Sequence, residues 1–142
     1  MIVVWGIAVL CTLFLSSCKR PEVLDNSTLV NSARNVALTF GPAYVPFFKE
    51  ANVSDVQVFK KKDYGGDSRP QIRKQIGRKF YTVTFTYDST AVKFDFGFAA
   101  RVRIWKDTGE PLDVIFGNGW GRNFFFLSFK EQTNHSPNDY EK

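Results

Sequence analysis

The strongest pattern in this chain of 142 residues is a run in which every second side chain is apolar. The run covers residues 92–104, and most of the residues between its apolar members are charged or small. This period of two predicts one long β-strand with one face on a core and the other in water. Such a strand spans about 43 Å, so we expect a bend near Gly97. The apolar members are Val92, Phe94, Phe96, Phe98, Ala100, Val102 and Ile104.

Shorter stretches on both sides predict further strands, separated by turns. Apolar residues alternate with threonines over 81–87, and β-forming residues also occupy 56–61, 112–116 and 121–129. Turn residues fill 88–90, 107–109 and 117–119, which join neighbouring strands as tight connections. Residues 60–79 predict a longer connection.

A helical period precedes the strands. Leu29, Ala33, Val36, Ala37 and Phe40 share the spacing of one helix face, and Gly41-Pro42 ends the pattern. The start of this helix is expected to be capped by Asn26, Ser27 or Thr28. Residues 43–51 predict a short helical turn that is interrupted by Pro46 and buries Tyr44, Val45, Phe47 and Phe48.

Together these patterns predict an α+β fold in which an N-terminal helix packs on a curved antiparallel sheet of four or five strands. A single domain is expected over 27–129, with fifteen Phe available for its core, followed by a polar tail over 130–142 that we expect to be disordered. This order of elements resembles the cystatin-like and nuclear-transport-factor-like cone folds of small exported bacterial lipoproteins. The resemblance rests on topology over 27–129, and such a fold does not fix an activity.

The first residues predict an export signal. An apolar run over 2–15 is too short to cross a bilayer comfortably, and the first charge is Lys19. Leu15-Ser16-Ser17-Cys18 then resembles the lipobox of bacterial lipoprotein precursors. The resemblance implies that a signal peptide (1–17) is removed, that Cys18 carries the lipid, and that 18–26 form a tether. The alternative interpretations of the same run are an uncleaved membrane anchor and a plain apolar segment.

The same resemblance implies a location and a redox state. A lipidated Cys18 anchors the protein in a bacterial cell envelope, and Lys19 in place of an aspartate implies the outer membrane more than the inner one. Cys11 is lost with the signal, so the mature chain has no second thiol for a disulfide. The fold must then be held by its core.

Few residues are suited to catalysis or to holding a metal or cofactor. His135 is the only histidine and lies in the polar tail, and Cys18 is committed to lipid. Asp107-Thr108-Gly109 has the letters of an aspartic-protease motif, but without a second copy it predicts a turn. Residues 117–121 are rich in glycine but precede a predicted strand, so we expect no dinucleotide site. We therefore expect no catalytic residue, metal or cofactor.

Two surfaces are candidates for binding. At the predicted hairpin, Trp120 offers a stacking face with Asn118, Arg122 and Asn123 around it, which suits a sugar or a peptide. A second surface is the polar face of the long strand, where Arg101, Arg103 and Trp105 are expected to be exposed.

Positive charge is concentrated in the connection over 60–79, although the whole chain carries only +5. A focused basic patch attracts anionic glycans and lipid headgroups, although such charge more often serves only to keep a loop soluble. Nucleic acid is not an expected partner of an exported protein. The patch consists of Lys60, Lys61, Lys62, Arg69, Arg73, Lys74, Arg78 and Lys79.

The sequence therefore supports two hypotheses. The first is a lipid-anchored envelope protein that binds an envelope protein, an anionic glycan or a lipid headgroup without catalysis. The second is a hydrolase in which two carboxylates act in the concave face of the sheet, for example Asp95 with Asp113 or Glu110.

Overall fold

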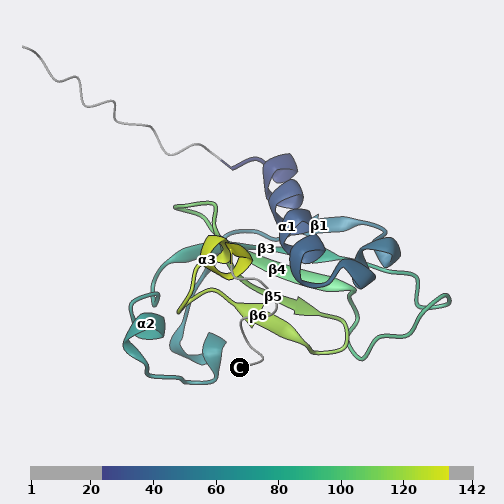
Figure 1. Cartoon of the computed structure of the whole chain (residues 1–142). Coiled ribbons are helices and arrows are strands. Elements are labelled where there is room, and N and C mark those ends of the chain that lie inside the picture. The colour runs from purple at the N-terminus through teal and green to yellow at the C-terminus, as the bar shows by residue number, and fades with distance from the viewer. Residues whose placement is uncertain (1–23, 135–142) are drawn as a thin grey trace, which may run out of the picture.

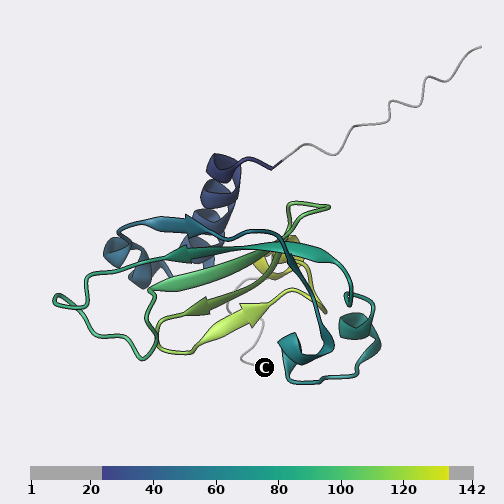
Figure 2. The ribbon, with the colours of Figure 1, turned by 180° about the vertical axis from the view of Figure 1, so that it is seen from behind.

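A computed structural model describes residues 24–134 (Figure 1), so Cys18, the predicted signal peptide and His135 lie outside the described residues. One long helix, α1 (Asn26–Phe40), lies across an antiparallel sheet, as the two opposite views show (Figures 1 and 2). The predicted α+β class, with an N-terminal helix on an antiparallel sheet, is confirmed.

The sheet has six strands rather than the predicted four or five. Its main order is β1-β3-β4-β5-β6, and β2 also pairs with β3. All of the pairs are antiparallel. The strands are β1 (Ala51–Val53), β2 (Gln57–Val58), β3 (Lys79–Phe85), β4 (Ala100–Trp105), β5 (Pro111–Phe116) and β6 (Gly121–Asn123).

The extra strand arises because the single strand predicted over 56–61 is replaced by two shorter ones, β1 and β2, of which β1 begins five residues earlier. Both β1 and β2 pair with β3, and Ser54 lies between them. The Ser54 hydroxyl accepts a hydrogen bond from the Thr82 backbone N–H at 3.0 Å, so a side chain takes the place of one rung of the ladder. Val56 and Val58 are 39% and 42% exposed, so the alternation there does not mark a core face.

Four further helical segments occur within residues 24–134, three of them between strands or between α1 and β1 and one after β6. The first, η1 (Pro42–Phe47), confirms the predicted helical turn after α1, but the predicted burial is wrong: Tyr44, Val45 and Phe48 are only partly buried, and Phe47 is 39% exposed. The other three are η2 (Lys61–Tyr64), α2 (Pro70–Arg73) and α3 (Phe129–Asn134).

Side-chain and backbone chemistry set the ends of α1. Asp25 is the N-cap, and its Oδ1 accepts a hydrogen bond from the Thr28 backbone N–H at 2.7 Å. The expected cap within 26–28 is therefore one residue or more too late. The predicted end at Gly41 is confirmed, and a Cβ there would lie 2.3 Å from the Phe116 ring.

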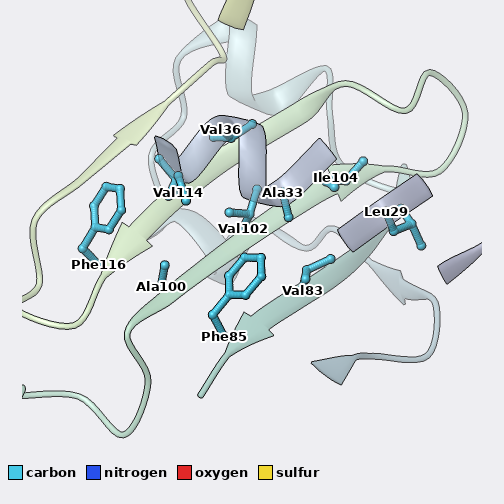
Figure 3. Close-up of a cluster of buried hydrophobic side chains, with 11 residues drawn as sticks. Leu29, Ala33, Val36, Val83, Phe85, Ala100, Val102, Ile104, Val114 and Phe116 are labelled. Carbon is cyan, nitrogen blue, oxygen red and sulfur yellow. The ribbon is translucent and has the colours of Figure 1, made fainter. Parts of the chain in front are cut away.

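The larger core lies between α1 and one face of the sheet (Figure 3). The predicted apolar face of α1 is buried there, except that Phe40 is only partly buried. The buried cluster comprises Leu29, Ala33, Val36, Ala37, Val83, Phe85, Ala100, Val102, Ile104, Val114 and Phe116.

A second, smaller core lies on the opposite face of the sheet. Phe80 and Trp105 point away from α1, because they have the opposite parity to the core residues of β3 and β4. Phe59 and Ile72 cover them from the connection between β2 and β3. That connection, predicted as a loop, therefore contributes to a core. Leu112 completes this buried cluster.

The long predicted strand is only half formed. Its second half is β4, whereas residues 86–99 make an excursion between β3 and β4. Among residues 24–134 no strand pairs with residues 92–99, and the β3–β4 ladder ends at the pair Phe85 and Ala100. The ring of Phe94 instead packs 5.4 Å from that of Tyr44, and the Phe96 backbone N–H donates to the Gly117 carbonyl.

The last predicted strand is also too long. The hairpin turn at 117–119 is confirmed by the Gly119 N–H, which donates to the Phe116 carbonyl, but β6 ends at Asn123. The Gln132 amide then donates to the carbonyls of Asn123 and Leu127, which folds α3 back on the end of β6. Residues 130–134 of the expected disordered tail are therefore helical.

Candidate functional site

The second face of the sheet is only partly covered, and beside the smaller core it carries a groove. Two adjoining hollows of about 350 and 400 Å³ share Gln57, Asp63 and Phe80. We call them together the open-face groove. Its other lining residues are Ser54, Val58, Lys60, Lys62, Thr82, Thr84, Arg101, Arg103 and Ile115.

At the boundary between the groove and the smaller core lies a buried ion pair. Arg103 on β4 and Asp113 on β5 are opposite each other in the ladder, and their side chains are 15% and 6% exposed. The Arg103 Nε donates to both carboxylate oxygens at 2.9 and 3.1 Å, and Nη2 donates to Oδ2. The geometry is bidentate, so the charge of Asp113 is neutralised where it is desolvated.

Burial and charge shift the pKa values around this pair. Desolvation lowers the pKa of Arg103, but the hydrogen bonds and the charge of Asp113 outweigh it, and the pKa of Arg103 is raised. Burial, with the nearby charge of Asp113, raises the pKa of Tyr64. Arg103 is therefore a fixed cation, and its charge is directed toward Asp113.

Arg101 lies two residues before Arg103 and points to the same face of the sheet. It forms no ion pair with any residue of 24–134, and its guanidinium lies 4.9 Å from the ring centroid of Phe98. Thr84 and Ile115 are its register partners on the two neighbouring strands. At this end of the groove, therefore, the Arg101 guanidinium packs on an aromatic ring and its positive charge has no carboxylate partner among the described residues.

The other end of the groove is formed by η2. Lys60 and Lys62 line it and form no ion pair within the described chain. Asp63 is the carboxylate in this lining, and its Oδ2 accepts a hydrogen bond from the Lys60 backbone N–H at 2.7 Å. The groove therefore has an excess of positive charge.

The predicted basic patch is not one surface. Arg69 pairs with Asp67, and this hydrogen bond lowers the pKa of Asp67. Arg78 donates to both oxygens of Asp107 at 2.7 and 3.1 Å, which lowers the pKa of Asp107. The others, Lys61, Arg73, Lys74 and Lys79, are exposed and do not line the groove.

Two further expectations about this face have different outcomes. Arg101 and Arg103 do lie on it, but Trp105 is only 5% exposed because the connection carrying Phe59 and Ile72 covers it. Asp107 belongs to a turn, as predicted, and Gly109 in this turn has a positive φ of 71°.

The predicted hairpin site lies on the helix side of the sheet. Trp120 is 43% exposed and stacks on Phe116, with 5.4 Å between the ring centroids. The Arg122 guanidinium lies 5.7 Å from the centroid of the Trp120 ring. Asn118 is used by the turn, because its Oδ1 accepts from the Trp120 backbone N–H at 3.1 Å. Asn123 is half-buried opposite Asp113. The structure thus brings Trp120 and Arg122 together, uses Asn118 within the turn, and places Asn123 in a shallow hollow that Arg122 also lines.

Sequence reasoning missed the polar middle of the groove. Thr82 and Thr84 belong to the alternation that predicts a strand, and they also face the groove, where the Thr82 hydroxyl donates to Gln57 Oε1 at 2.7 Å. The alternation of threonines with apolar residues over 81–87 was the available signal for a polar sheet face. Gln57 and Ser54 had no such signal, because they belong to short strands and a break between them.

Within residues 24–134 no cluster of three or more His, Cys, Asp or Glu side chains is placed to hold a metal ion. In the same part of the chain, none of the helices is long and apolar enough to cross a membrane. Comparison of the chain with protein-family models gives no match, and comparisons with curated proteins and with solved structures give none either.

Proposed function

We propose that this protein is a lipid-anchored envelope protein whose domain binds a ligand without catalysis through the open-face groove. The observation that carries the proposal is the charge arrangement on the open face. Arg101, Lys60 and Lys62 have no carboxylate partner among residues 24–134, whereas the buried carboxylate of this face, Asp113, is paired with Arg103. Unpaired cations beside hydroxyl and amide groups suit recognition of an anionic or polar molecule.

This site replaces the hairpin as the main contact surface. Trp120 and Arg122 remain neighbours, but they lie across the sheet from the groove, as the register of Arg122 with Val114 shows. The groove also combines two signals of the sequence, the basic connection and the polar face of β4.

The hydrolase hypothesis receives less support. A carboxylate that acts as an acid or base must exchange protons with a substrate. Asp113 is enclosed and held by two nitrogens of Arg103, and Asp63 accepts a backbone hydrogen bond. Glu110 immediately precedes β5, Asp95 lies in the excursion over 86–99, and neither of them lines the groove.

The anchor is tested by labelling cells with a clickable fatty acid. We expect label on the wild type and none on Cys18→Ala, together with loss of membrane association. Label on both proteins, or on neither, would contradict the anchor but would leave the groove untouched.

The groove is tested by cosedimentation of the full chain, in detergent, with cell-wall fragments. Thr84→Trp puts a bulky side chain in the groove while keeping a good β-former, and it should abolish cosedimentation. Asn35→Trp, on the exposed side of α1, is the matched control and should cosediment like the wild type. Equal cosedimentation of all three proteins would exclude the open face as the contact surface.

A further inference from the structure

We infer that the ligand of the open-face groove is a linear acidic glycan, held by its anionic groups at the two ends of the groove and by its hydroxyl groups in the middle. This inference rests on the proposed function and adds the class of ligand. It follows from three features of the groove: where its cations lie, what lies between them, and what the strand edges allow.

The cations lie at opposite ends. Arg101 is in register with Thr84, whereas Lys60 and Lys62 line the hollow at the level of Phe80. Thr84 and Phe80 are four residues apart on β3, which corresponds to about 13 Å along the strand. One phosphate or carboxylate can occupy only one end, so the arrangement fits a ligand with at least two separated anionic groups.

Between these two ends the lining is polar and carries no unpaired cation. Arg103 lies opposite Thr82, but its charge is paired with that of Asp113, and Asp63 adds a carboxylate to the lining. Thr82 and Gln57 are hydrogen-bonded to each other, and Thr84 lies beside them. Hydroxyl and amide groups at this position pair with sugar hydroxyls, whereas a polyphosphate of closely spaced charges would place anions beside the Asp63 carboxylate and beside a guanidinium that is already paired.

The position of the groove argues against an acidic peptide. Extended peptides bind sheets by adding to an edge, where unpaired backbone groups supply the hydrogen bonds. Most of the groove instead lies over the faces of β3 and β4, whose backbone groups pair with each other and with the neighbouring strands, and the edge strand β2, which lines one hollow, has only two residues. Side chains are therefore the main donors for a ligand here.

The experiment measures binding of the full chain in detergent to an oligogalacturonate by calorimetry. We expect saturable binding that weakens at least tenfold in Arg101→Gln and in the double variant Lys60→Gln/Lys62→Gln. Arg73→Gln/Lys74→Gln is the matched control, because it removes two exposed cations of the same connection outside the groove, and its Kd should change less than twofold.

Arg101→Lys guards against a structural explanation, because Arg101 packs on Phe98. Arg101→Lys keeps the charge, so it should bind the oligogalacturonate more tightly than Arg101→Gln does. The two variants should have the same thermal midpoint. Dextran sulfate tests whether sulfate replaces carboxylate, and either acidic glycan supports the inference if the groove variants weaken it and the control does not.

Three results would overturn the inference. If the control variant loses as much affinity for the glycan as the groove variants do, the binding is a general attraction between opposite charges. Binding of neutral dextran, of inorganic polyphosphate or of glycerol 3-phosphate as tightly as the acidic glycans would mean a different ligand class, a lipid headgroup in the last case. If no probe binds while Thr84→Trp still abolishes cosedimentation, the ligand class is wrong and the proposed function stands.

Discussion

At the scale of single residues, the pair of Arg103 and Asp113 decides what the open face can do. It is desolvated, bidentate, and placed across two central strands. Because Asp113 is paired, its carboxylate is not available to a ligand in the groove, and Arg101 is the arginine of β4 that remains unpaired. The sequence predicted that Arg101 and Arg103 share a face, because alternation sets that. It could not predict that only one of them is neutralised, because this depends on the register of β5.

Breaking this pair should destabilise the fold. Asp113→Asn leaves Arg103 buried without a countercharge, and we expect the free energy of unfolding, measured by urea denaturation, to fall by about 3–5 kcal/mol. Asp107→Asn breaks a more exposed pair with Arg78 and should cost less than about 1 kcal/mol. A double replacement, Arg103→Met with Asp113→Leu, should recover most of the loss. An Asp113→Asn variant as stable as Asp107→Asn would show that the pair is not desolvated in solution.

At the scale of elements, the helix was predicted well and the strands less well. The helix period depends on local sequence, and both its apolar face and its end at Gly41 are confirmed. The strand over 92–104 had an equally clear period, but a strand also needs a partner, and none is available before Ala100. Much of the groove follows from the same long-range pairing, so Gln57 and Thr84 could not be brought together from the sequence.

The start of α1 gives a pH-dependent prediction. The hydrogen bond from the Thr28 backbone N–H lowers the pKa of Asp25 below its ordinary value of 3.8. A lowered folded-state pKa stabilises the fold above pH 3.8, and this contribution is lost as pH falls through the folded value. Asp25→Asn keeps a cap that does not titrate, so its thermal midpoint should fall less than that of the wild type between pH 5 and about pH 2. Identical pH profiles would exclude a role for this carboxylate. Asp25→Ala should lower the midpoint at neutral pH as well.

The end of α1 gives a steric prediction. A methyl group at Gly41 would meet the Phe116 ring, so Gly41→Ala should cost about 1–3 kcal/mol in the free energy of unfolding. Gly97→Ala is the matched control, because a Cβ there meets nothing within 4 Å, and its stability should hardly change. The free energy of unfolding of both variants is measured by urea denaturation. If it is the same for both, the contact between Gly41 and the Phe116 ring can widen at no cost in stability.

At the scale of the whole molecule, one sheet carries two cores. The larger is covered by α1, and the smaller is covered by the connection between β2 and β3, which also carries Lys60 and Lys62. The sequence pointed to the first core through the periods of the helix and strands. It did not reveal the second, because Phe59 and Ile72 are isolated apolar residues in a basic segment. The position of the groove is therefore set by a segment that was predicted to be a loop.

Loosening the smaller core should open that connection. Phe59→Ala removes a fully buried ring that contacts Trp105, and we expect a loss of about 3–5 kcal/mol. Limited trypsin digestion should then cleave within 60–79 sooner than in the wild type. Leu29→Ala, in the larger core, is the control. It should lower the free energy of unfolding without making cleavage within 60–79 faster than cleavage elsewhere. Cleavage of both variants at the same sites and rates would show that the two cores unfold as one unit.

The strands at the two edges of this sheet are short, and their length affects how readily copies of the protein associate with one another. The strand β6 has three residues, and the opposite edge is divided into β1 and β2, of three and two residues. Long, flat edges are templates on which one molecule adds to the next, and these edges offer only a few consecutive free backbone groups. Copies brought close together on a membrane by the proposed lipid anchor would therefore have little tendency to join edge to edge into aggregates.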